Sequence, residues 1–192
     1  MPLIGSFGAV SARGVGGIGG GGGGLAGAFE SIASATPSGS SVSFTSIPST
    51  YTHLQIRYLA RDNASGTLRD MNLRLNNDTG SNYAFHFLRG SGSAASVSAA
   101  ASSSSIQAND ILTGSTSTAN IYGVGIIDIH DYASTTKNTT VRWFSGNDQN
   151  GSGYASLSSG LFIDTTAVNR IDITQTFAAG TIFALYGIKA AA

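Results

Sequence analysis

From residue 29 to the end of the chain, apolar and polar residues alternate with a period of two, in short runs separated by turn residues. A period of two places successive side chains on opposite faces of an extended strand, whereas an amphipathic helix needs apolar residues at every third or fourth position. The run HLQIRYLA, residues 53–60, shows this alternation clearly, and no segment carries a sustained helical stripe. The sequence therefore predicts an all-β fold.

About eight to ten strands are expected from these runs. A chain of this size with regularly spaced strands usually buries its apolar faces between two sheets, which predicts a β-sandwich or jelly-roll-like domain. Turn residues at 76–82 predict a hairpin, and the final run, 180–188, is apolar on both faces, as in a central strand. A Ser/Ala/Gly tract at 90–105 predicts an exposed loop or a weak edge strand. The other runs are SVSFTSI, MNLRLN, YAFHF, NIYGVGIIDIHDY, NTTVRWF, YASLSSGLFI and VNRIDIT.

Residues 1–28 have a different composition, with six consecutive glycines at 19–24. Ordering those six residues costs on the order of 6–12 kcal/mol of backbone entropy, which their own side chains cannot offset. Fully extended, the segment reaches about 95 Å. We therefore expect an extended glycine-rich N-terminal arm, residues 1–28, held by contacts outside itself, followed by one β-sandwich domain, residues 29–192.

Charged residues make up only 10% of the chain and sum to zero net charge, against roughly 25% charged residues in a typical soluble domain. With no basic stretch, the sequence lacks the electrostatic footprint of a nucleic-acid-binding protein. Its longest apolar runs are far shorter than the roughly 20 residues of a membrane span. Free sheet edges are usually guarded by lysine and proline, yet the chain has two lysines and three prolines. We expect symmetry mates to cover some edges in a homo-oligomer, with a trimer favoured.

No motif in the sequence predicts catalysis, a cofactor or a metal site. The glycine-rich stretch matches GxGxxG only trivially, since no strand precedes it and no helix follows it. His53, His86 and His130 have no second ligand at metal-binding spacing. The loop NDQNGSG, residues 147–153, is rich in oxygen ligands but lacks the terminal acid of a calcium loop, which favours a hairpin turn. No convincing pair of carboxylates suggests glycoside hydrolysis. We expect a protein that is not an enzyme.

Trp143 and Tyr154, with the amides of Asn147 and Asn150, leave two interpretations open. Aromatic rings stack on sugar rings and amides bind hydroxyls, so these four residues, with Tyr122 and Tyr132 nearby in the sequence, could form a glycan-binding surface. Aromatic residues also dominate core burial, which favours a core position for Trp143.

The opening MPLIGSFGAVSARGVG resembles an N-terminal signature found in tail-fibre and other virion proteins of tailed phages, particularly those of marine and cyanobacterial hosts. The later strings SVSFTSIPSTYTHLQIR and FALYGI are similar to β-rich virion proteins of the same phages. The resemblance implies a non-enzymatic structural component of the virion, best matched by a tail-associated fibre or adaptor protein. A capsid decoration or head-fibre protein is the close alternative, and a host-glycan-binding module is the alternative of a different class.

The same resemblance implies a role for residues 1–28 as an anchoring arm. Ile4, Phe7, Ile18 and Leu25 would pin it in a groove of another virion protein, because glycine allows close backbone approach between them. A trimeric glycine bundle along a fibre axis is the competing interpretation, although the segment lacks the regular Gly-X-Y triplet of collagen.

Overall fold

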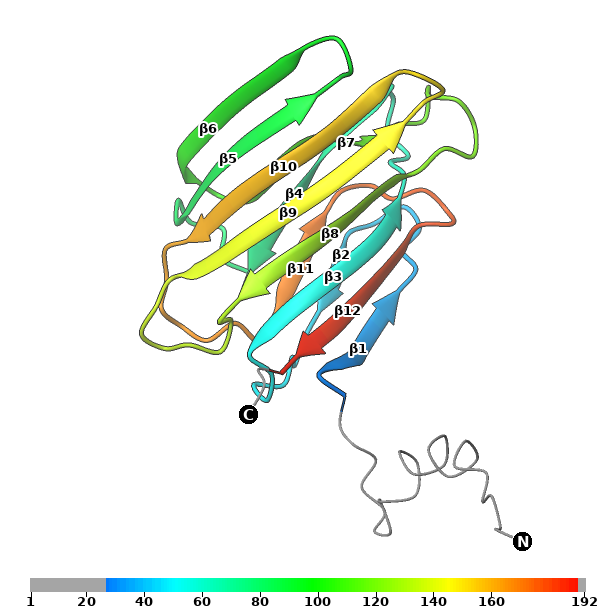
Figure 1. Cartoon of the computed structure of the whole chain (residues 1–192). Helices are drawn as coiled ribbons and strands as arrows, with labels where there is room; N and C mark the ends of the chain where they lie inside the picture. The colour runs from blue at the N-terminus through cyan, green and yellow to red at the C-terminus, as the bar shows by residue number, and fades with distance from the viewer. Residues whose placement is uncertain (1–26, 190–192) are drawn as a thin grey trace, which may run out of the picture.

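The computed structural model describes residues 27–189, and all regular structure in this range is strand. The all-β prediction is confirmed (Figure 1). No helix in the described range could cross a membrane. The strands are β1 (Phe29–Ala35), β2 (Val42–Phe44), β3 (His53–Ala60), β4 (Leu68–Leu75), β5 (Tyr83–Gly90), β6 (Ala95–Ser103), β7 (Ile106–Thr113), β8 (Gly123–His130), β9 (Thr139–Asp148), β10 (Gly153–Phe162), β11 (Ile171–Thr174) and β12 (Ile182–Ile188).

The strands form two sheets whose registered strand pairs are all antiparallel. Eight strands make the larger sheet, in the order β1-β12-β3-β8-β9-β10-β5-β6, and four make the smaller one, in the order β2-β11-β4-β7. In Figure 1 the smaller sheet lies behind the larger one and covers part of its rear face. This arrangement is a β-sandwich, as the sequence predicts.

In most strands, alternate residues point into the space between the sheets and form the core. In β3, Leu54, Ile56 and Tyr58 are buried, while the residues between them face outwards. Across the sheet, the Trp143 indole packs edge-on against the Tyr58 ring with centroids 6.2 Å apart, and its Nε1–H donates a hydrogen bond of 3.0 Å to the Tyr58 hydroxyl. Burial raises the pKa of that hydroxyl well above its usual range.

The hairpin predicted around residues 76–82 is wrong. β4 pairs with β7 and β11 in the smaller sheet, whereas β5 pairs with β10 and β6 in the larger one. The turn therefore crosses from one sheet to the other. Tyr83 stabilises this connection between the sheets. Its hydroxyl accepts a hydrogen bond from the main-chain N–H of Leu75 at 3.0 Å and lies 3.1 Å from the Leu75 carbonyl oxygen.

The Ser/Ala/Gly tract contains an edge strand, β6, and its residues are mostly exposed. From Ala95 to Ala100 it pairs regularly with β5 and carries neither charge nor proline. The opposite edge strand, β1, has an irregularity between Ser31 and Ala33, and the edge strand β2 is only three residues long. Bulges and short edge strands discourage pairing with other chains, so β6 is less protected than β1 or β2.

Candidate functional site: the outer face of the large sheet

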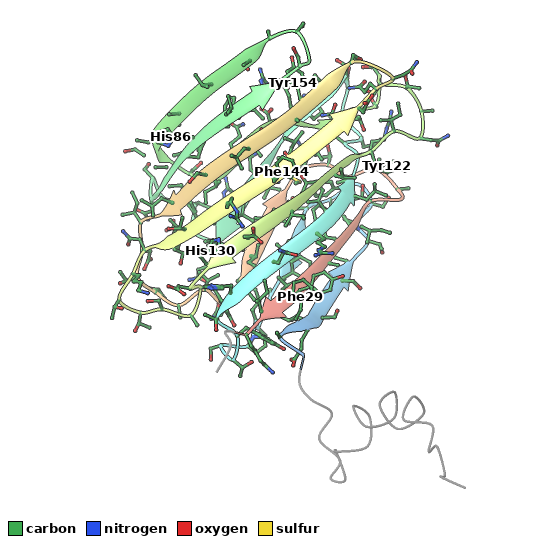
Figure 2. The ribbon with its side chains drawn as sticks, viewed as in Figure 1. Phe29, His86, Tyr122, His130, Phe144 and Tyr154 are labelled. Carbon is green, nitrogen blue, oxygen red and sulfur yellow. The ribbon has the colours of Figure 1, made fainter. Side chains whose placement is uncertain are left out.

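The outer face is the side of the eight-stranded sheet that is turned away from the smaller sheet. No other part of residues 27–189 covers it, and it carries many large apolar side chains with Phe144 near its centre (Figure 2). Those exposed by 40% or more are Phe29, Leu59, Leu88, Val97, Val124, Phe144, Leu157 and Ile182. A scattered exposed leucine is ordinary, whereas a contiguous apolar patch usually marks an interaction site.

The strand register places five apolar side chains in one row across the outer face. Phe144 of β9 pairs with Leu157 of β10, Leu157 pairs with Leu88 of β5, and Leu88 pairs with Val97 of β6. On the other side of Phe144 the row continues to Ile126 of β8. Phe144 is 59% exposed and Val97 74% exposed. We call this row of Ile126, Phe144, Leu157, Leu88 and Val97 the apolar ridge.

On β9, β10, β5 and β6, the next row of outward-facing residues, two positions along each strand, contains almost no side chain, whereas on β8 it holds Val124. Gly146 of β9 pairs with Ala155 of β10, Ala155 pairs with Gly90 of β5, and Gly90 pairs with Ala95 of β6. We call this row of Gly146, Ala155, Gly90 and Ala95 the trough. Three of its members, with Tyr122, Val124 and Asp148, line a hollow of about 640 Å³. A second hollow of about 510 Å³, lined by Leu88, Val97 and Leu157 among others, includes ridge residues and their neighbours on the polar side.

Charged groups lie on both sides of these two rows. Beyond the ridge, Arg142 Nη2 donates to Asp128 Oδ2 at 2.7 Å, and Gln55 Nε2 donates to Asp128 Oδ1 at 2.7 Å. Burial tends to raise the pKa of Asp128, but these two donors outweigh it and the pKa lies below its ordinary value. Beyond the trough, Asp148 is exposed and accepts a hydrogen bond from the Gly151 main-chain N–H at 3.1 Å.

The proposed glycan surface does not assemble as predicted. Trp143 is only 1% exposed and faces the core, so it cannot stack on a sugar, and the core interpretation is the correct one. Asn147 is 7% exposed, and its Nδ2 donates to the Asp110 carbonyl oxygen at 2.8 Å. Tyr154 is half-buried, with the Arg89 guanidinium 4.8 Å from its ring centroid. Asn150 is exposed in the β9–β10 turn with a φ of 61°.

Only Asn147 and Tyr154 of these four line the larger hollow. The sequence analysis included Tyr122 and the loop that contains Asp148, but it missed the glycine floor of this hollow. It also missed Phe144, although the alternation within TVRWF requires Trp143 and its neighbour to face opposite sides of the sheet. The predicted glycan surface was placed on Trp143, which faces the core, whereas the exposed aromatic side chain of this strand is Phe144.

Two of the three histidines lie side by side. His53 of β3 pairs with His130 of β8, and their ring centroids are 5.1 Å apart. His53 Nδ1 accepts a hydrogen bond from the Asp131 main-chain N–H at 3.0 Å, and Asp131 is held by Lys137 Nζ at 2.8 Å. The hydrogen bond from Lys137 is the main cause of a lowered Asp131 pKa. Within residues 27–189, no group of three or more His, Cys, Asp or Glu side chains is placed to hold a metal ion.

The predicted anchoring residues Ile4, Phe7, Ile18 and Leu25 lie outside the described residues. No family model, curated protein or solved structure matches this chain. The candidate site is therefore interpreted from its geometry, which offers an apolar ridge beside a hollow rather than a cluster of reactive groups.

Proposed function

We propose that this chain is a non-enzymatic structural subunit of a tailed-phage virion, as a tail-associated fibre or adaptor protein. The observation that carries the proposal is the exposed apolar ridge on the outer face. On the outer face about half of each of eight large apolar side chains is exposed, four of them on the ridge, which amounts to an apolar area on the order of 600 Å². That area is at the upper end of what monomers expose, so the face is suited to burial against protein.

The ridge supports a role as an assembly subunit, and the N-terminal signature supports the tailed-phage virion as the assembly. Other virion proteins are the proposed partners of the arm, and the virion is the proposed location. A capsid decoration or head-fibre protein would use the same face, so the tail assignment rests on the likeness of residues 1–16 to tail-fibre anchors.

Immunogold electron microscopy of purified virions tests this proposal, with antibodies raised against the full chain. Gold at the tail is the expected result. Gold over the head would favour the decoration or head-fibre alternative, and virions that bind no antibody, with the chain absent by mass spectrometry, would refute a structural role.

The arm can be tested in the same virions. An Ile4→Asp/Phe7→Asp variant should be lost from purified particles while it remains present in the infected-cell extract. Ala9→Asp is the matched control, because it adds a charge to the same segment without removing a proposed anchor. Equal loss of both variants, or of neither, would argue against anchoring by these two side chains.

A second candidate function, binding of a host-surface glycan, is favoured by the larger hollow. The Tyr122 ring, the Asp148 carboxylate and an open backbone floor offer stacking, hydrogen bonding and space for a sugar ring. Asp148→Ala should then abolish binding of the purified chain to host cells. Asn150→Ala changes an exposed turn residue outside the lining and is the control. Unchanged binding by Asp148→Ala, or no binding by the wild type, would exclude this function for the hollow.

A further inference from the structure

We infer that the outer face is covered by a second copy of this chain, with the apolar ridge of each copy lying in the trough of the other. This inference rests on the proposed role as an assembly subunit and names the partner of the exposed face. It follows from the order of side chains along four neighbouring strands, β9, β10, β5 and β6.

The ridge and the trough are adjacent rows of one surface, and one symmetry operation exchanges them. Consider a twofold axis that lies in the interface, runs across the strands and passes between the two rows. It places each strand over the same strand of the second copy with the direction reversed. Phe144 then lies opposite Gly146 of the partner subunit, because the two are equally far from the axis on β9. Interfaces with twofold symmetry require this kind of self-complementary surface.

The same operation matches three further strands, β10, β5 and β6, without further adjustment. On β10, Leu157 lies opposite Ala155 of the partner subunit. On β5, Leu88 lies opposite Gly90 of the partner subunit. At the sheet edge, Val97 lies opposite Ala95 of the partner subunit, which extends the contact to the weakly protected strand β6. Large side chains therefore meet small ones on these four strands, whereas on β8 the large residue Ile126 faces Val124 of the partner subunit.

Charges on β9 are complementary under the same axis. Arg142 and Asp148 lie three residues on either side of Ser145, so Arg142 faces Asp148 of the partner subunit. The Arg142 side chain is 61% exposed, and Asp148 is exposed beside the hollow. The chain has zero net charge, so no long-range repulsion opposes the approach of two copies.

The available area suits a stable dimer. Five strands spaced about 4.8 Å apart and eight residues long, at about 3.3 Å per residue, span a plane on the order of 600 Å². Side-chain relief increases this area towards the roughly 800 Å² per partner of a typical stable interface. Two sheets can pack face to face about 10 Å apart, which leaves room for interdigitated side chains such as Phe144 and Leu157.

Filling the trough tests the inference, and Gly90 is the position for it. A Cβ added there meets no heavy atom within 4 Å, and the backbone of Gly90 is not in the left-handed region. Gly90→Leu should therefore leave the fold of the single chain intact. We measure mass by light scattering after size-exclusion chromatography, on the full chain at up to about 0.5 mM. The wild type should have twice the 19.5 kDa mass of one chain. Gly90→Leu should raise the dimer dissociation constant at least about tenfold.

A compensating variant separates loss of fit from loss of folding. In Leu88→Ala/Gly90→Leu, the large side chain moves from the ridge to the trough, so each copy again presents a large residue opposite a small one. This variant should recover dimer affinity to within about threefold of the wild type. Circular dichroism and thermal unfolding of all three chains check that each is folded.

The proposed dimer can be refuted by any one of four results. A wild type that stays monomeric, a trimer, an unaffected Gly90→Leu dimer, or a folded double variant that remains monomeric would overturn it. The virion labelling experiment is independent of these masses. A monomeric chain that labels virions refutes the dimer alone, whereas a dimer that is absent from virions refutes the virion assignment alone.

Discussion

Trp143 and Phe144 are neighbours on β9 but face opposite sides of the sheet, so replacing each by alanine should change the free energy of unfolding by very different amounts. Trp143 is 1% exposed and Phe144 59% exposed. Truncating a buried tryptophan to alanine costs about 3–5 kcal/mol through lost packing and the remaining cavity. Trp143→Ala also removes the Nε1–H donor to the buried Tyr58 hydroxyl, and the loss of this buried hydrogen bond costs roughly 1–3 kcal/mol more. The total approaches the whole stability of a domain of this size, about 5–15 kcal/mol.

The assay is urea unfolding followed by far-ultraviolet circular dichroism, because Trp143 is the only tryptophan and its removal eliminates the usual fluorescence probe. We expect Trp143→Ala to unfold at a much lower urea concentration or to be unfolded in buffer. Measured at concentrations where the chain is monomeric, Phe144→Ala should lie within about 1 kcal/mol of the wild type. A folded Trp143→Ala chain within about 1 kcal/mol of the wild type would refute the assignment of this residue to the core.

Three further predictions concern single residues. Asp62 is fully buried and accepts a hydrogen bond from Arg69 Nε at 3.1 Å, so Asp62→Ala should lower the free energy of unfolding by about 3–5 kcal/mol in urea titrations. Burial tends to raise the pKa of Asp172, but the hydrogen bonds from Arg170 and Ser43 lower it below 3.8. Because the folded-state pKa is the lower one, this contribution to stability is present above pH 3.8 and is lost as the pH falls through the folded-state pKa. Acid titration should accordingly show a smaller loss of stability in Asp172→Asn than in the wild type. A Cβ at Gly160 would lie 2.5 Å from the Ile106 side chain, so Gly160→Ala should destabilise by about 1–3 kcal/mol in thermal unfolding.

Alternation in the sequence predicted most of the strands because a half-buried strand needs a period of two. The strands that it missed have identifiable causes. β1 is rich in Ser and Ala and shows little contrast between its faces. In β7 the alternation is interrupted at Asp110, whose φ is 55°, and the register with β4 shifts nearby. Such an irregularity turns the following residues to the other face, so the strand loses its pattern in the sequence.

The candidate site was harder to predict, because a period of two shows that a strand has two faces but not what covers each face. The final strand, β12, illustrates this ambiguity. Its residues are apolar on both faces, which predicted a central strand. β12 does pair on both sides, with β1 and β3, but its outward-facing residue Ile182 is 46% exposed.

The ridge and trough depend on register, which is a relation between strands. Gly146 and Gly90 lie in the same row because each pairs with Ala155, and the pairing of Ala155 with Gly90 joins segments that are distant in the chain. Each glycine or alanine taken alone resembles an ordinary residue of a Ser/Gly-rich sequence. Once the strands are paired, these residues line up beside a row of large apolar side chains, and the pattern becomes that of a surface shaped to receive its own copy. The low charge of the chain fits the same explanation, since a face that is buried against protein has no need of the lysines that protect an exposed one.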